Sequence, residues 1–317
     1  MLRYAIKRIL LGFMTLFIIL SIVFILVKML PTVIPIEYLT QEGFDPVAWA
    51  RKYGWDQPVF GQYLLWILNV IREWDWGISM HMRPGVEAFR VLSENLATTM
   101  RINIFAFLIS MPLGFLFGII AALNKNKWPD YIISFFVIFF ISIPNFVVVT
   151  LLMYFPAYKW GWFPIQFPPS NVAAIEMARG MVIPVMALSF GPIATLTRYT
   201  RAELTEVLTS EFLLLARTKG LNQRQCVMRH ALRNSMVPLI GIVIGNLIGI
   251  IGGSIVIEQI YGVVGVGQIF LRAISQLDYN VIMVSLAFYT GIGLISTLII
   301  DLSYGIVDPR IRMGARK

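Results

Sequence analysis

Long apolar stretches alternate with short polar ones along most of this chain. Six apolar stretches are centred near Ile18, Leu113, Val147, Ala187, Gly245 and Gly291. A helix of about 20 apolar residues spans the hydrocarbon core of a bilayer. The third and fourth stretches are interrupted by Pro144 and Pro184, which a bundle of helices tolerates. The apolar runs are continuous, which excludes a transmembrane β-barrel. The pattern predicts an all-α, polytopic membrane protein with six transmembrane helices.

The composition agrees with a membrane location. Hydrophobic residues make up 58% of the 317 residues and charged residues only 14%, which is more apolar than a soluble domain can hide from water. The first apolar run, from about Ile9 to Leu30, follows a basic N-terminus and in that respect resembles a signal peptide. It continues into LPTVIPIEYLT without a small-residue cleavage site, so we expect a retained helix.

The distribution of Lys and Arg indicates the orientation, because basic residues gather in short cytoplasmic loops. If the N-terminus is cytoplasmic, 16 of the 26 basic residues fall on the inside. They are Arg3, Lys7, Arg8, Lys125, Lys127, Arg198, Arg201, Arg217, Lys219, Arg224, Arg229, Arg233, Arg310, Arg312, Arg316 and Lys317. We therefore expect both termini to be cytoplasmic. Anionic lipid of the inner leaflet then accounts for the net charge of +9, and no nucleic-acid partner is needed.

Residues for enzymatic chemistry are scarce. One cysteine, Cys226, and two histidines, His81 and His230, provide too few ligands for a metal or haem cluster. Cys226 falls on the cytosolic side, where no disulfide is expected, and we interpret His230 as a surface or interface residue. The chain contains no G-x-x-x-x-G-K-[ST] loop for ATP. Glu258 and Asp301 are expected near helix ends, so buried ionisable groups that would drive ion-coupled transport are few. We therefore expect a non-catalytic protein whose energy source lies elsewhere.

A basic, polar run between Arg198 and Pro238 lies between apolar segments. A helix is expected from about Ala202 to Lys219, with Gly220 as its stop, and Asn222 with Gln225 indicates the capped start of a second helix. Phe212, Leu213, Leu214 and Leu215 form an apolar knob in the first helix, and Met228, Ala231, Leu232 and Met236 form an apolar stripe in the second. The knob packs against the membrane face or the ends of the chain's own spans, or it inserts into a groove on a cytosolic partner.

Several motifs carry a resemblance to a known family. The segment EFLLLARTKGLNQRQCVMRHALRNSMVPLI resembles the EAA loop of ABC importer permeases, with Ala216, Gly220 and Pro238 at its alanine, glycine and closing proline. LRYAIKRILLG, GWDQPVFGQYLLWILNV followed by WDWGIS, IEQIYGVVGVGQIFLRAI and IVDPRIR occur in the order of the dipeptide, oligopeptide and nickel permease group. The resemblance covers nearly the whole chain. It departs from the family where the leading Glu-Ala-Ala reads Leu214, Leu215, Ala216, and where Pro-Gly-Asp after the first helix reads Pro31, Thr32, Val33.

The resemblance implies a type I ABC importer permease of the MetI-like fold. It divides the chain into a first helix at 1–30, an extracellular interfacial region at 31–95, a five-helix core at 96–309 with a cytoplasmic coupling loop at 202–236, and a tail at 310–317. The expected location is the cytoplasmic membrane of a prokaryote. The expected partners are a second permease, two ATP-binding subunits, a solute-binding protein and membrane lipid. ATP and Mg would be bound by the partner subunits, and no cofactor by this chain.

The resemblance also assigns a coupling role. Glu211, Phe212, Leu213, Leu214, Leu215, Ala216, Arg217, Thr218, Lys219 and Gly220 would transmit force from the ATPase, with Ala216 and Gly220 small so that backbones approach closely. Arg217, Arg224, Arg229 and Arg233 would supply polar contacts to the ATPase or to phospholipid.

Two further features have open interpretations. The region 31–95 is rich in Trp and Tyr and is expected to form helices at the outer interface, either as an aromatic belt or as a contact for the binding protein or the paired permease. The spacing of Gly241, Gly245 and Gly249 favours close helix contact, either within the subunit or along a transport pathway.

Alternative functions remain open. Short peptides are the leading expectation for the cargo, with nickel or another small solute as the alternative within the same class. A homo-oligomeric channel is the alternative of another class, and it leaves the basic run between Arg198 and Pro238 unexplained. A membrane-embedded enzyme would need convergent polar residues, and Asn103, Asn145, Asn246, Ser142 and Ser254 are expected to be scattered.

Overall fold

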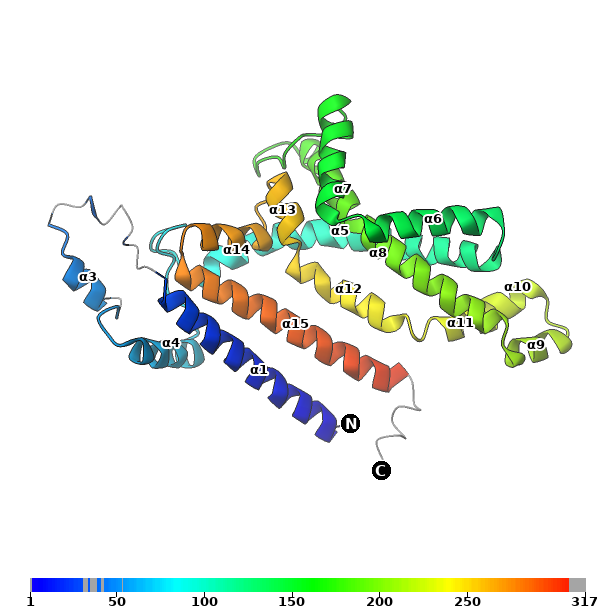
Figure 1. Cartoon of the computed structure of the whole chain (residues 1–317), viewed down its shortest axis with the longest axis horizontal. Coiled ribbons are helices and arrows are strands. Elements are labelled where there is room, and N and C mark those ends of the chain that lie inside the picture. Colours follow the sequence, from blue (N-terminus) through cyan, green and yellow to red (C-terminus); the bar gives the residue numbers. More distant parts are fainter. Residues whose placement is uncertain (1, 31–33, 35–38, 41–42, 53, 308–317) are drawn as a thin grey trace.

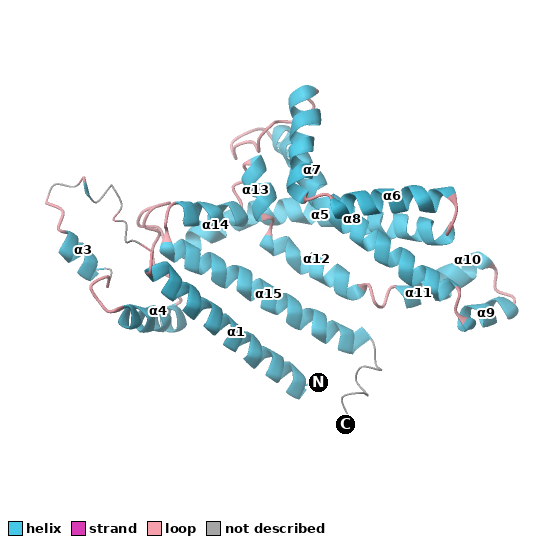
Figure 2. Ribbon diagram, viewed as in Figure 1, coloured by secondary structure: helices cyan, strands magenta, loops and turns pink. Residues whose placement is uncertain are grey.

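The computed structural model describes residues 2–307 apart from 31–33, 35–38, 41–42 and 53. The tail at 310–317, most of the IVDPRIR motif and the departure at 31–33 lie outside these residues. The described chain is built of helices, and its β-pairing is limited to an isolated bridge between Ile78 and Glu87. The all-α, polytopic class is therefore confirmed (Figures 1 and 2).

The helices follow one another along the whole chain, in the order shown in Figure 1. They are α1 (Leu2–Lys28), α3 (Pro46–Lys52), α4 (Val59–Glu73), α5 (Ala88–Leu123), α6 (Trp128–Ser142), α7 (Asn145–Leu152), η1 (Met153–Lys159), α8 (Ala174–Leu208), α9 (Glu211–Thr218), α10 (Gln223–Gln225), η2 (Cys226–Ala231), α11 (Leu232–Ser235), α12 (Ile240–Gly252), α13 (Ile255–Tyr261), α14 (Val266–Ser275) and α15 (Tyr279–Val307).

The described helices give between four and seven candidate spans. Among the described residues, four helices, α1, α5, α8 and α15, are long and apolar enough to cross a bilayer. Three bent pairs, α6 with α7–η1, η2–α11 with α12, and α13 with α14, bring the number to seven if each counts as one span. The exact count of six is therefore not confirmed.

The two expected proline interruptions have different outcomes. At Pro144 the chain bends by 103° between α6 and α7–η1, and Ile143 has the extended backbone that a following proline favours. Pro184 lies inside α8, which continues through it and through Pro192, as expected of a proline that a helix bundle tolerates. Packing of α8 against its neighbours outweighs the loss of one helical hydrogen bond at each proline.

The core is centred on the contact between α5 and α8. Gly114 and Gly118, four residues apart on α5, face Leu196 and Thr200 of α8. A methyl group on Gly118 would lie 2.5 Å from Cβ of Thr200, so only glycine permits this approach. Small residues at such spacing bring spanning helices close together.

A second group of contacts joins the aromatic region to α1 and α15. Trp76 is buried with Ala88 and Tyr279, and its ring lies 6.0 Å from that of Trp66, centroid to centroid. The Trp66 ring in turn lies 5.4 Å from Phe24 of α1. Several of the aromatic side chains of 31–95 therefore form a packed cluster on the spans, in addition to any belt at the interface.

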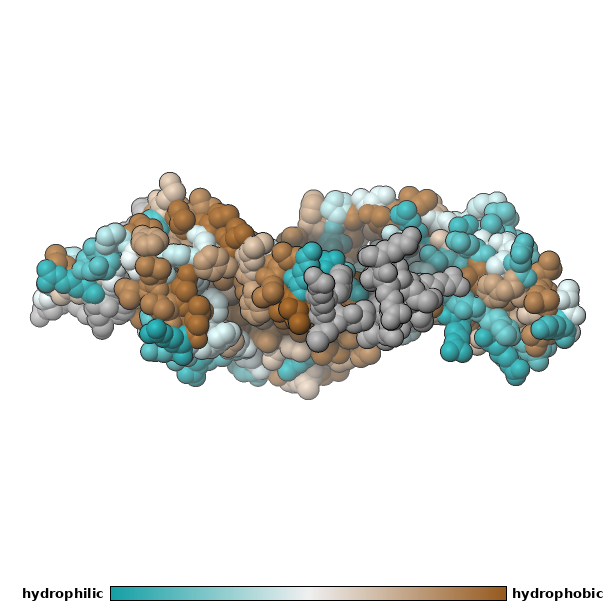
Figure 3. Space-filling view, turned by 90° about the horizontal axis from the view of Figure 1, so that it is seen from below, coloured by the Kyte–Doolittle hydropathy of each residue, from teal (hydrophilic) through white to brown (hydrophobic). Residues whose placement is uncertain are grey.

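The surface has two polar ends. Figure 3 shows hydrophilic residues mainly at the two ends of the long axis, over α3–α4 and over α9–α10, with hydrophobic surface between them. This distribution is the one expected of a chain whose middle lies in lipid.

Candidate functional site

The expected first helix of the basic run is divided in two. The span helix α8 continues to Leu208, the chain turns at Thr209 and Ser210, and a separate helix α9 begins at Glu211. The expectation of one helix from Ala202 to Lys219 is therefore wrong. The hydroxyl group of Ser210 donates to the carbonyl of Val207, which satisfies a carbonyl at the end of α8 locally and favours the break. Figure 1 shows α9 and α10 beyond the end of α8.

One face of α9 is held by the rest of the chain. Leu213 is 0% exposed and Ala216 is 9% exposed. Both belong to a cluster with Ala122 at the end of α5, Leu204 of α8, and Cys226 and Ala231 of η2. Ala216 is small because it lies in this cluster. The interpretation that the knob packs on the chain's own spans is therefore right for Leu213.

The opposite face of α9 is exposed. Leu214 is 62% exposed and Leu215 57%, and Phe212 and, on η2, Met228 are exposed as well. Arg217, Arg224, Arg229 and Arg233, on the same segment, are all exposed as well, as are Glu211, Thr218, Lys219 and Gly220. Figure 3 shows hydrophobic and hydrophilic side chains intermixed at this end. We call Phe212, Leu214, Leu215 and Met228 with these four arginines the docking surface.

The turn between the two helices forms as the sequence predicts. Gly220 has φ +87°, the left-handed conformation that stops a helix at low cost only with glycine. The amide of Gln225 donates to Oδ1 of Asn222 at 2.8 Å, and the amide of Asn222 donates to Oε1 of Gln225 at 3.1 Å. This reciprocal pair is a full capping box. No atom outside its chain neighbours lies within 4 Å of a Cβ built on Gly220, so its role within the chain is conformational and not close packing.

A buried ion pair fixes the helix that supports the docking surface. Arg201 of α8 donates from Nε and Nη2 to both carboxylate oxygens of Asp130, at 2.5 and 2.8 Å. The amide of Asn126 and the hydroxyl group of Ser134 donate to the same carboxylate. Asp130 is nearly inaccessible, whereas Arg201 keeps 34% of its side chain exposed. The pair joins α6 to α8, and sequence reasoning missed it because its partners are 71 residues apart.

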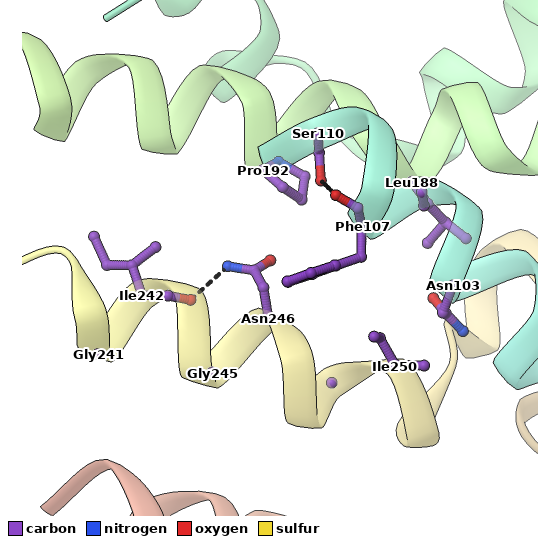
Figure 4. Close-up of a pocket in the computed structure, with 12 residues that line it drawn as sticks. Asn103, Phe107, Ser110, Leu188, Pro192, Gly241, Ile242, Gly245, Asn246 and Ile250 are labelled. Atoms are coloured by element: carbon purple, nitrogen blue, oxygen red, sulfur yellow. Dashed lines mark hydrogen bonds between the residues drawn. The ribbon is translucent and has the colours of Figure 1, made fainter. Parts of the chain in front are cut away.

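A cavity of about 310 Å³ lies between α5, α8 and α12 (Figure 4). Gly241, Gly245 and Gly249 line it from α12, together with Asn246, and Asn103 lines it from α5. No other side chain lies within 4 Å of a Cβ built on Gly249, so the glycine stripe borders open space at that position. The expectation that Asn103 and Asn246 are scattered is wrong, because the fold brings them to one cavity.

Both asparagines of the cavity donate to a backbone carbonyl one turn earlier on their own helix. The side-chain amide of Asn246 donates to the carbonyl of Ile242 at 2.8 Å, and that of Asn103 donates to the carbonyl of Thr99 at 2.8 Å. Figure 4 shows the ring of Phe107 pointing from α5 toward Asn246. Amide oxygens beside an aromatic ring and a glycine-lined wall can contact both polar and apolar parts of a solute.

A buried carboxylate holds α13 and α14 against α5. Glu258 accepts hydrogen bonds from the hydroxyl group of Thr99 at 2.9 Å and from the amides of Gly267 and Gln268 at 2.8 and 3.1 Å. A Cβ on Gly265 would lie 2.6 Å from this carboxylate, so the loop can close around it only with glycine there. The sequence predicts Glu258 near a helix end, and the finding adds that it is buried and satisfied by three donors.

The remaining ionisable groups are placed as follows. Asp301 pairs with Arg8 at 3.1 Å, which ties α15 to α1. Cys226 is buried and free. No group of three or more metal-ligating side chains occurs among the described residues.

Comparisons with known proteins identify the family. Residues 114–313 match the sequence family described as binding-protein-dependent transport system inner membrane component. The dipeptide transport system permease proteins DppB of Bacillus subtilis and of Lactococcus lactis subsp. cremoris are 35% and 32% identical to this chain. The first match covers 99% of both chains, and the second covers 99% of this chain and 100% of the relative.

An oligopeptide permease and one solved structure are also similar. The oligopeptide transport system permease protein OppB of Salmonella typhimurium is 31% identical, over 98% of this chain and all of the relative. The MetNI methionine ABC transporter in inward facing conformations matches with TM-score 0.47 and 16% identity, covering 71% of this chain and 96% of that one. The assignment rests on the sequence matches, which span the whole chain. The chain therefore belongs to the family of binding-protein-dependent transport system inner membrane components and, within it, to the dipeptide and oligopeptide permeases.

Proposed function

We propose that this chain is the transmembrane subunit of an ATP-driven importer that moves short peptides across the cytoplasmic membrane. The observation that carries the proposal is the docking surface. Three apolar side chains of α9 and Met228 of η2 are exposed among four arginines, although an inward face holds the same helices firmly on the spans. Exposed apolar side chains on a segment that also exposes charged ones are typical of a protein contact.

The partner at this surface is an ATP-binding subunit, with one for each of two paired permeases. ATP and Mg are bound by these partners and not by this chain. A second, homologous permease completes the transmembrane part, and a solute-binding protein delivers the cargo from outside. Both termini, and with them α9 and η2, lie on the cytoplasmic side, as the distribution of basic residues supports.

The geometry supports a direct mechanical connection. Leu204, in the cluster under α9, and Pro192, at the cavity, are on the same helix α8. Twelve residues of helix separate them, about 18 Å along the axis. A pull on α9 would therefore move the cavity wall through one continuous helix, with α6 held to it by Asp130 and Arg201. The cavity with Asn103, Asn246 and the α12 glycines would be this subunit's part of the pathway, open alternately to each side.

Purification of the chain from its native membrane in mild detergent tests the proposal. We expect recovery of a second permease and two ATP-binding subunits in fixed stoichiometry. Uptake of labelled di- and tripeptides by the reconstituted complex should depend on ATP and on the binding protein. A stable homo-oligomer that conducts without ATP would refute the proposal and favour the channel. Uptake of Ni²⁺ but not of peptides would favour the nickel alternative.

A further inference from the structure

A second cavity, of about 530 Å³, lies far from the cavity between α5, α8 and α12. It is formed by the last turn of α1, by α3 and α4, and by the start of α15. Lys28, Arg51, Trp55, Trp66 and Tyr279 line it. The helix α1 lies at the periphery of the molecule beside α15 (Figure 1), and most of its side chains are exposed. One wall of the cavity is therefore built by a helix at the edge of the molecule.

Two cationic side chains and one carboxylate line the cavity, so the described lining has a net positive charge. The ammonium group of Lys28 lies 3.5 Å above the centroid of the Trp55 ring and 5.6 Å from that of Phe24. Neither Lys28 nor Arg51 is in an ion pair with another described residue. The lining carboxylate, Asp75, accepts a hydrogen bond from the amide of Gly77 at 2.8 Å. A half-buried ammonium group that makes no ion pair with a described residue is stabilised when an anion or water approaches it.

A buried hydrogen-bond donor belongs to another residue that lines the cavity. The indole Nε1 of Trp66 is buried and makes no hydrogen bond to a described residue. The indole nitrogen can only donate, so it needs an acceptor. Two cations and one unused donor therefore line the same cavity.

The surroundings of the cavity are those of a membrane interface. On α4, Phe60, Leu64, Leu68 and Ile71 are exposed at helical spacing, while Trp66 on the other side packs against Phe24 of α1. A helix with one exposed apolar face and aromatic residues lies in the plane of the interface, with that face in the acyl region. On α1, Ile25 and Leu26 next to Lys28 are exposed as well. A ligand that enters here has room for an anionic head in the cavity and for apolar chains along α1 and α4.

We propose that this cavity binds the headgroup of an anionic phospholipid. The phosphate lies between Lys28 and Arg51 and accepts a hydrogen bond from the indole of Trp66. The acyl chains follow the exposed faces of α1 and α4. The lipid fills the gap between α4 and the spans and so anchors the α3–α4 segment to them. The inference needs only the membrane location, and it stands or falls independently of peptide transport.

Lipid retention by the purified full chain, with the subunits that accompany it, tests the proposal. The protein is exchanged into nanodiscs of phosphatidylcholine in which about one lipid in five is phosphatidylglycerol. The protein is then extracted with detergent, and the lipids that stay bound are counted by native mass spectrometry. We expect one phosphatidylglycerol per chain to be retained in preference to phosphatidylcholine. Lys28→Gln and Arg51→Gln should each weaken this preference about fivefold, the equivalent of about 1 kcal/mol per cation near a charged surface.

Arg72→Gln is the matched control. Arg72 is an exposed cation on α4 that does not line the cavity, and its variant should retain lipid as the unmodified chain does. Equal retention of phosphatidylcholine, or an equal loss with Arg72→Gln, would overturn the proposal. Displacement of the lipid by millimolar inorganic phosphate would overturn it as well, because the site would then be one for free phosphate. If Lys28→Gln fails to accumulate, Arg51→Gln alone decides, since Arg51 is exposed and its loss leaves the aromatic packing intact.

Discussion

The two faces of α9 allow folding and coupling to be separated by single substitutions. Leu213 is fully buried in the cluster with Leu204 and Cys226, whereas Leu214 and Leu215, its neighbours in the chain, are more than half exposed. Leu213→Ala removes a buried isobutyl group and leaves a cavity. Such changes cost about 2–5 kcal/mol of the free energy of unfolding, and we expect about 3 kcal/mol here because the cluster is small and can partly relax.

The exposed pair should behave in the opposite way. Leu214→Ala with Leu215→Ala removes side chains that contact little within the chain, so the free energy of unfolding should change by less than about 0.5 kcal/mol. If the two leucines are buried by an ATP-binding subunit, each loses about 1–2 kcal/mol of association free energy. Affinity for that subunit should then fall about 30- to 1,000-fold for the pair, with peptide uptake lost and the protein still in the membrane.

The assay measures both properties on the same preparations. Thermal unfolding in detergent gives the stability of the permease, and titration with its ATP-binding subunit gives the affinity. Leu213→Ala should lower the unfolding midpoint and keep the affinity at temperatures where it is folded. The reasoning is refuted if the exposed pair keeps full affinity and uptake, or if all three leucines reduce stability equally.

Three further predictions concern the support of the site. Glu258→Ala leaves the donors of Thr99 and α14 without an acceptor and should cost about 3–5 kcal/mol of the free energy of unfolding. Glu258→Gln keeps an acceptor and should cost less. Equal losses of stability in thermal unfolding would contradict this account of the carboxylate. Gly220→Ala should cost about 1 kcal/mol because of the left-handed backbone, and Gly220→Asn should cost less, so identical unfolding midpoints would argue against a conformational role. Asp130→Asn should cost about 2 kcal/mol of the free energy of unfolding, less than the roughly 3–5 kcal/mol typical of fully buried pairs, because Arg201 is partly solvated. A double variant that also carries Arg201→Gln should recover part of this stability. If no stability is recovered, the two residues do not act as a pair.

Several local features followed from neighbouring residues alone. Gly220 stops α9, and Asn222 with Gln225 caps the next helix, because those hydrogen bonds and dihedral angles involve residues within one turn of each other. The membrane class likewise followed from the apolar runs, since their length and continuity are properties of the sequence. The motifs identified the family because each is a short run of neighbouring residues that can be compared directly with relatives.

Other features depended on how the helices pack. The apolar knob was visible in the sequence, but its division into inward Leu213 and outward Leu214 and Leu215 depends on the place where α8 ends and on the cluster beneath α9. Pro144 bends the chain and Pro184 does not, because α5 and the other neighbours of α8 support its continuous path.

Apolar length and turn chemistry are short-range properties, and the sequence was sufficient to establish the membrane class and the turn at Gly220 between α9 and the helix that follows it. Only the tertiary structure decided which polar residues meet. Asp130 with Arg201 and Thr99 with Glu258 form hydrogen bonds between helices far apart in the chain, and Asn103 and Asn246 line one cavity from two such helices. No periodicity encodes those pairs, because they arise from the crossing of helices at close range and from the high cost of leaving a buried polar group unpaired.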